Sequence, residues 1–151
     1  MQGVLLAAAA PAVMDDSNGS IAAGMSRGAL LTREEFAQRA DARCRRLNEF
    51  WATTGNPKTL AGIDRQMDVV VPALWRAWSD QTDLVPPQEE ELVAMRWMGG
   101  MAAFARDIDA VGRAASRRDQ RGVQAAFRRS EGHAGEAAQL SKQLGMRVCF
   151  Q

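Results

Sequence analysis

The chain has 151 residues, of which 46% are hydrophobic and 25% are charged, and its formal net charge is +1. This composition is that of one soluble domain with a sizeable core. The near-neutral charge excludes a global attraction to nucleic acid or to an anionic membrane. No apolar run reaches the length of about 18 residues that is typical of a membrane span.

The first 31 residues differ from the rest of the chain. Residues 4–13 are apolar and rich in alanine, and a run of Asp, Ser, Asn and Gly follows at 15–20. This pattern resembles the end of a secretory signal with a small-residue cleavage site near Ala12, but the positively charged start of such a signal is missing. Two interpretations stay open, a signal truncated by a misplaced start and a low-complexity leader. Both place residues 1–31 outside a folded helical domain of residues 32–151.

The helical pattern starts at Thr32. Thr32 and Glu35 form a capping box, in which each side chain accepts a hydrogen bond from the other residue's backbone N–H. The apolar residues that follow recur at intervals of three and four, which predicts one helix to about Thr54 with a single core face. That face carries Phe36, Ala40, Cys44, Leu47 and Trp51. A Gly-Asn-Pro sequence at 55–57 ends this helix and starts the next.

The second predicted helix carries another apolar stripe. Its inward side chains are Leu60, Ile63, Met67, Val70, Val71, Leu74 and Trp78. Pro72 lies within it, and a proline has no N–H to donate to the carbonyl of Asp68. We therefore expect this helix to be kinked or broken near Pro72. Residues 80–87 then form the longest internal connection.

The third helix is predicted over about residues 87–116. Pro86 and Pro87 precede a Gln-Glu-Glu-Glu run, whose carboxylates complement the dipole at a helix N-terminus. Gly99 and Gly100 in its middle lower helix stability, and a close helix crossing is the simplest compensation. Apolar residues on two faces predict the most buried helix of the set. One face carries Leu92, Met95 and Ala102, and the other carries Trp97, Met101, Phe104, Ile108 and Val111.

The fourth helix is predicted to begin after Asp119, a good N-cap residue, and to end at Gly145. Its apolar stripe consists of Val123, Phe127, Ala134, Ala137 and Leu144. Four amphipathic helices with mostly short connections predict an all-α fold, an antiparallel four-helix bundle.

The only two cysteines of the chain are Cys44, on the core face of the first helix, and Cys149, close to the end. In an up-down bundle the first and fourth helices are neighbours, so the residues after Gly145 can turn back toward Cys44. A disulfide is favoured over its alternative, two buried reduced thiols. Because persistent disulfides belong to oxidising compartments, an extracytoplasmic or secreted location goes with the disulfide, and a cytoplasmic location goes with the thiols.

Two short motifs carry a resemblance to a protein family. Residues 40–48 read Ala-Asp-Ala-Arg-Cys-Arg-Arg-Leu-Asn, and residues 144–149 read Leu-Gly-Met-Arg-Val-Cys. This layout resembles the uncharacterised small secreted or lipid-anchored helical proteins of actinobacteria, in which Ala-Asp-x-x-Cys in the first helix is matched by Leu-Gly-x-x-x-Cys near the C-terminus. The likeness covers about residues 33–150 and implies an exported helical protein, but it supplies no catalytic residues. The incomplete leader is where this chain departs from that pattern.

Residue types that carry catalytic or metal chemistry are sparse. His133 is the single histidine and lies between Glu131 and Glu136. A carboxylate di-metal bundle needs two Glu-x-x-His motifs, so we expect a structural or exposed histidine and no metal or cofactor. No spacing suggests a Ser/His/Asp or Cys/His site, and we therefore expect no enzyme activity.

Two groups of residues are candidates for binding. Arg39, Arg43 and Arg46 recur one helical turn apart and are a candidate anion-binding group, with a second basic group at 117–129. A solvated helix face balanced by nearby acids is favoured over that interpretation. Methionine packs irregular space well, so a methionine-rich stretch is a candidate lining for a small-molecule cavity, although ordinary core packing is favoured. The candidate lining residues are Met95, Met98, Met101 and Trp97.

Together these observations predict a non-catalytic, extracytoplasmic helical bundle that acts as a structural or protein-interaction module. The alternative is a carrier of a small hydrophobic ligand in the bundle core. A third interpretation is a cytosolic bundle with reduced cysteines that binds nucleic acid or a partner protein. In the favoured interpretation neither nucleic acid nor a transmembrane segment is involved, and the sequence identifies no protein partner.

Overall fold

The computed structural model describes residues 31–150. These residues form four α-helices and one 3₁₀ turn and contain no strand, so the predicted all-α fold is confirmed. The elements are α1 (Arg33–Thr53), α2 (Leu60–Thr82), η1 (Gln88–Glu90), α3 (Glu91–Ser116) and α4 (Gln120–Gln143). The leader or signal expected over residues 1–31 lies outside the described residues except for Leu31. That residue is buried and packs into the core rather than lying outside it.

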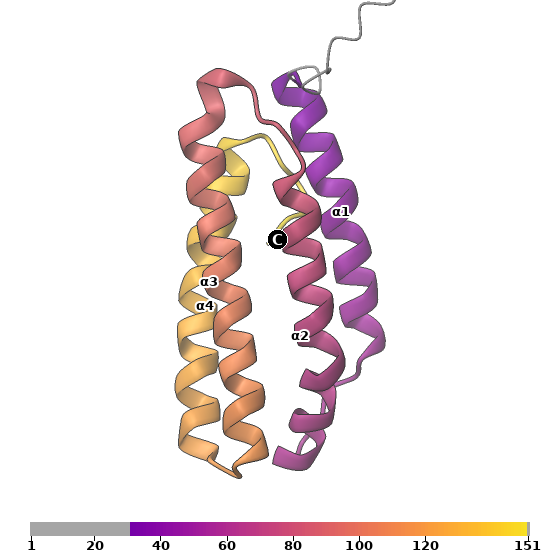
Figure 1. Cartoon of the computed structure of the whole chain (residues 1–151), viewed down its shortest axis with the longest axis vertical. Coiled ribbons are helices and arrows are strands. Elements are labelled where there is room, and N and C mark those ends of the chain that lie inside the picture. Colours follow the sequence, from indigo (N-terminus) through magenta and orange to yellow (C-terminus); the bar gives the residue numbers. More distant parts are fainter. Residues whose placement is uncertain (1–30, 151) are drawn as a thin grey trace, which may run out of the picture.

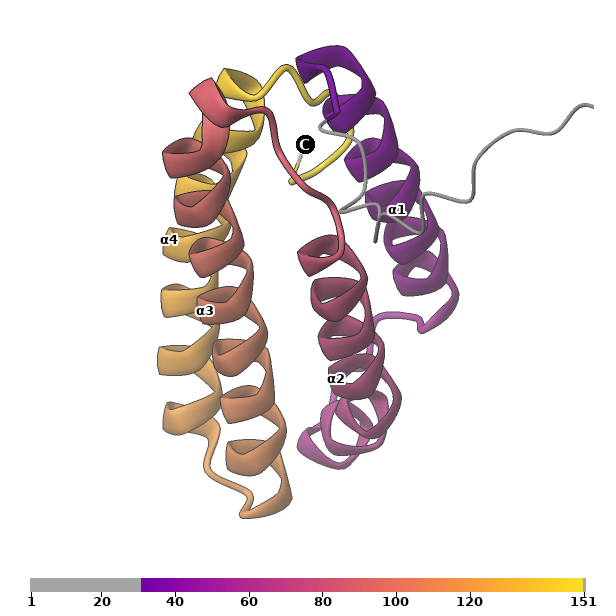
Figure 2. The ribbon, with the colours of Figure 1, turned by 45° about the horizontal axis from the view of Figure 1, so that its top comes forward.

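Consecutive helices run in opposite directions along the long axis of the molecule (Figure 1). The contacts between α3 and α4 give the register, because Arg96 pairs with Glu136 whereas Asp107, further along α3, pairs with Arg129, earlier in α4. The third and fourth helices pack closely along their length, and α2 packs on α3. The first helix packs mainly on α2, on the side of the molecule away from α4 (Figure 2).

The helix ends form where the sequence places them. The Thr32 hydroxyl accepts a hydrogen bond from the Glu35 N–H at 3.2 Å, and the Glu35 carboxylate accepts one from the Thr32 N–H at 2.9 Å, which confirms the capping box. Asp119 caps α4 through its carboxylate, which accepts a backbone N–H at 2.9 Å. Gly55 and Gly145 follow α1 and α4 with φ angles of 75° and 80°, a left-handed conformation that favours glycine.

Helix α2 passes through Pro72 without a break, so of the two expected alternatives the broken helix is wrong. Both Pro72 and Asp68 are exposed. Water can therefore replace the backbone donor that the carbonyl of Asp68 loses. Val70 and Leu74, on the opposite face, are buried in the core and keep the flanking turns in place.

Helix α3 is the central element, and Trp97 and Val111 on it are fully buried. However, one of its two predicted apolar faces is covered only in part, since Ala102 on that face is buried and the other two residues are not. Leu92 and Met95 were expected to point inward and are 73% and 55% exposed. They lie on the side of α3 opposite Trp97, which faces the other helices, so the bundle does not cover them.

The expected close helix crossing at the glycine pair involves one glycine of the two. A Cβ at Gly100 would lie 3.4 Å from the Ala137 side chain of α4, so the two backbones approach closely there. Gly99 has no neighbour within 4 Å of the corresponding position. The crossing therefore depends on Gly100 alone.

Candidate functional site

A small apolar cavity lies where α1, α2 and α3 meet the C-terminal segment, with a volume of about 160 Å³. Its lining residues are aliphatic or aromatic apart from one disulfide cysteine and one asparagine. The lining residues are Cys44, Leu47, Asn48, Trp51, Leu74, Trp78, Met101, Phe104, Ala105 and Phe150. Such an environment binds apolar surface rather than charge.

The helical repeat places these side chains together. Residues 44, 47, 48 and 51 recur on one face of α1, and residues 74 and 78 recur on the facing side of α2. The ring of Phe104 lies 6.5 Å from that of Trp51 and 5.5 Å from that of Phe150, the second pair edge to face. The Trp78 ring N–H donates to the Met98 carbonyl at 3.3 Å, so its indole is fixed at the cavity wall.

The C-terminal segment borders the cavity through Phe150 and is held in place at several points. The Cys44–Cys149 disulfide predicted from the sequence is present, with the two Cα atoms 5.2 Å apart. The Asp41 carboxylate accepts hydrogen bonds from three successive backbone N–H groups, those of residues 147, 148 and 149, at 2.8, 2.9 and 3.3 Å. The Ser141 hydroxyl lies 2.6 Å from the Ala137 carbonyl and 3.1 Å from the Cys149 carbonyl, so the two carbonyls share its single hydrogen.

These contacts orient the residue that follows. Phe150 has a φ of 57°, an uncommon conformation for a non-glycine residue. In this conformation its ring lines the cavity beside Phe104. The disulfide therefore does more than join α1 to the C-terminal segment, because it also holds the Phe150 ring against the cavity.

The methionines expected to line one cavity lie at two different places in the structure. Met101 lines the apolar cavity, whereas Met95 and Met98 line a separate groove beside Phe36. Trp97 is fully buried between the helices and lines neither space. The four candidate residues therefore do not share one cavity, and most of the observed lining comes from α1 and α2.

The three arginines of the candidate anion-binding group do not all lie at one place. Arg43 and Arg46 line a groove between α1 and α2 together with Arg76 from α2, and Arg39 lies outside this groove. The second basic group begins at the turn between α3 and α4 (Figure 1) and extends into α4, where Arg129 pairs with Asp107. No residue of the second basic group lines the groove that holds Arg43 and Arg46.

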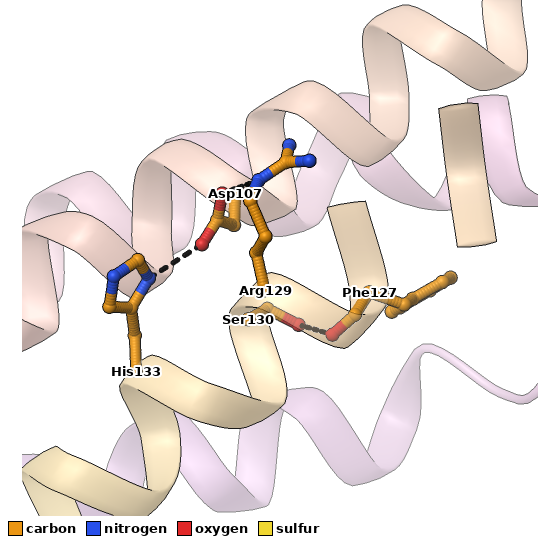
Figure 3. A network of polar contacts seen from close by, with 5 residues as sticks. All are labelled: Asp107, Phe127, Arg129, Ser130 and His133. Carbon is orange, nitrogen blue, oxygen red and sulfur yellow. Dashed lines mark hydrogen bonds and ion pairs between the residues drawn. The ribbon is translucent and has the colours of Figure 1, made fainter. Parts of the chain in front are cut away.

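His133 has a partner that the sequence did not reveal. Its Nδ1 lies 2.7 Å from the carboxylate of Asp107 on α3, and the other oxygen of that carboxylate accepts a hydrogen bond from Arg129 at 3.0 Å (Figure 3). The one available signal was an aspartate beside Ile108 on the apolar face of the third helix. Its partners on α4 become apparent only once the register of the two helices is known.

This polar cluster lacks the parts of a nucleophilic site. The hydroxyl of Ser130 points to the carbonyl of Phe127 rather than to the imidazole of His133 (Figure 3). A catalytic serine would have to hydrogen-bond that imidazole. With Asp107 7% exposed and bonded to two side chains of α4, the cluster joins α3 to α4.

Comparisons with protein-family models, curated proteins and solved structures find no match to this chain. Within residues 31–150 no helix is long and apolar enough to cross a membrane. The same residues contain no group of three or more His, Cys, Asp or Glu side chains placed to hold a metal ion.

Proposed function

We propose that this protein binds a small apolar molecule, without catalysis, in the cavity beneath its C-terminal segment. This proposal rests on the cavity, which has a volume of about 160 Å³ and is lined by four aromatic side chains. Apolar cavities of about 150 Å³ in other proteins stay dry and take up benzene or xenon. This function was the alternative in the sequence analysis, and the largely apolar lining now favours it.

The size and chemistry of the cavity limit the ligand class. Sites for drug-sized ligands measure about 300–1,000 Å³, so this cavity suits a single ring or a short aliphatic chain. Asn48 is the one amide-bearing residue of the lining, and the Trp78 ring N–H is already bonded to the Met98 carbonyl. A ligand with one hydrogen-bonding group at its end would therefore be accommodated, and a charged one would not.

Ligand-dependent unfolding tests the proposal. We expect benzene or indole to raise the melting temperature of the oxidised protein, since a ligand that binds only the folded state stabilises it by about 2.7 kcal/mol at 100 times its Kd. Ala105→Leu fills the cavity and should abolish the shift. Ala103→Leu is the matched control on α3, because residue 103 does not line the cavity. Equal shifts in both variants, or none in the parent protein, would refute the proposal.

We propose further that the protein works outside the cytoplasm, in keeping with the resemblance to small exported helical proteins. The Cys44–Cys149 disulfide supports this location, because such bonds persist in oxidising compartments. The test is the intact mass of the protein from its native host, after thiol alkylation with and without prior reduction. Blocked thiols are expected, and freely alkylated thiols would point to the cytoplasm.

The structural or protein-interaction role expected from the sequence stays a prediction. The exposed Leu92 and Met95 on α3 are the side chains on which it would rest. Exposed apolar residues are common on protein surfaces, so they do not identify a partner. The cytosolic interpretation with nucleic-acid or partner binding also stays a prediction, and reduced cysteines in the native host would favour it.

A further inference from the structure

A groove between α1 and α2 is lined by arginines from both helices. It has a volume of about 280 Å³ and lies on the other side of the α1–α2 seam from the apolar cavity, with Leu47 in the wall of both. Arg43 and Arg46 are one turn apart on α1, and Arg76 faces them from α2. The remaining lining residues are Leu47, Phe50, Ala73, Ala77 and Asp80.

The three guanidinium groups of this groove lack partners within the described chain. None of them forms an ion pair there, which is also true of most other arginines of residues 31–150, since only Arg33, Arg96, Arg113 and Arg129 pair with an acid. The Nη1 atom of Arg43 is buried and makes no hydrogen bond. A buried donor without an acceptor is rare in folded proteins and requires an explanation.

We infer that this groove is a binding site for a phosphate monoester group. A planar guanidinium matches the oxygens of a phosphate with two parallel N–H donors, and three arginines line this one groove. Three arginines and Asp80 give the groove a formal charge of +2, which complements the charge of about −1.5 to −2 on a phosphate monoester. Phe50 and the two alanines provide an apolar floor for the group that carries the phosphate.

The phosphate group belongs either to a soluble molecule or to a lipid headgroup, and two probes distinguish these sources. The full oxidised protein is titrated with phenyl phosphate by calorimetry at constant ionic strength, with sodium chloride as the reference. In parallel it is mixed with phosphatidylcholine vesicles that do or do not contain phosphatidic acid, and co-flotation is measured. Calorimetric binding indicates a soluble phosphate, and flotation that requires phosphatidic acid indicates a lipid headgroup. Binding to neither probe overturns the inference.

Substitutions locate the binding. Arg43→Gln should weaken binding by about tenfold or more, as the loss of a charge-assisted hydrogen bond implies. Arg39→Gln is the control with the same charge change outside the groove, and it should leave the affinity within about twofold. Because Arg43 is partly buried, the double variant Arg46→Gln/Arg76→Gln repeats the test with exposed residues alone. Equal weakening by the control and the groove variants means that net charge alone drives binding, and this also overturns the inference.

Discussion

Asp41→Asn removes the negative charge that three backbone N–H groups of the C-terminal segment share. Hydrogen bonds to a charged group each contribute about 1.5–3 kcal/mol, and an amide oxygen still accepts part of this set. We therefore expect the free energy of unfolding of the oxidised protein to fall by about 1–3 kcal/mol, measured by urea denaturation. Glu49→Gln, an exposed residue of α1 without a hydrogen bond in the described structure, is the control and should leave the midpoint unchanged. Equal midpoints for the two variants would contradict the assigned role of Asp41.

The capping box of α1 predicts a pH dependence. The backbone N–H of Thr32, followed by its hydroxyl, lowers the pKa of Glu35 below the ordinary value of 4.5. A lowered carboxyl pKa means that its stabilising effect is complete above about pH 4.5 and is lost as the pH falls through the folded-state value. Glu35→Gln should therefore lower stability near neutral pH and flatten its decline in acid, as followed by urea midpoints across the acid range. The exposed neighbour Glu34→Gln should keep the parent pH profile, and the same profile for both variants would argue against the box.

Two glycines of α3 predict opposite effects of a substitution by alanine. Gly99→Ala meets no neighbour and should stabilise the protein by about 0.5–1 kcal/mol, because alanine is the better helix former. Gly112→Ala places a Cβ 2.9 Å from the Cβ of Met67 on α2 and should destabilise it by about 1–3 kcal/mol. Thermal unfolding measures both. Each variant is the control for the other, and a stabilising effect of Gly112→Ala would contradict the close approach of α2 and α3 at this position.

The elements were predictable because their signals are local. The Thr32–Glu35 box, the Asp119 cap and the glycines at 55 and 145 each act within a few residues, so the sequence is enough to find them. The passage of α2 through Pro72 was not predictable. It depends on which side of the helix faces water, and that is decided by packing against α1 and α3.

The candidate site was predictable only in part, because it is made of contacts between distant residues. The cysteine pair was found since only one pairing exists. The three N–H groups held by Asp41 and the pairing of Asp107 with His133 cross more than 20 residues of sequence and depend on helix register. Met95 was assigned to a cavity because apolar spacing cannot tell a covered face of α3 from an uncovered one.

The α3–α4 pair and helix α1 are held in the bundle by different contacts. Helices α3 and α4 pack closely along their length, and Asp107 adds a polar link between them. Helix α1 packs mainly on α2, and its link to the end of α4 passes through the C-terminal segment. The disulfide therefore closes the bundle at the point where helix packing is weakest.

Cys44→Ala/Cys149→Ala tests this arrangement. The bond spans 105 residues of sequence. In the chain-entropy model, a disulfide that closes a loop of about this length stabilises the folded state by about 4.7 kcal/mol. The total free energy of unfolding of a domain is about 5–15 kcal/mol. We expect the free energy of unfolding to fall by several kcal/mol in urea.

The same variant should lose amide-exchange protection unevenly. Without the bond, the C-terminal segment keeps the hydrogen bonds to Asp41 and Ser141, but these are too few to hold α1 once it moves away from α2. Protection should therefore fall first and furthest in α1 and the C-terminal segment, while α3 and α4 keep theirs relative to the new global stability. Since Phe150 follows Cys149 directly, indole should also stabilise the variant less than the parent protein. A uniform loss of protection would instead mean that the bond acts only on the unfolded chain and that α1 is held as firmly as the other helices.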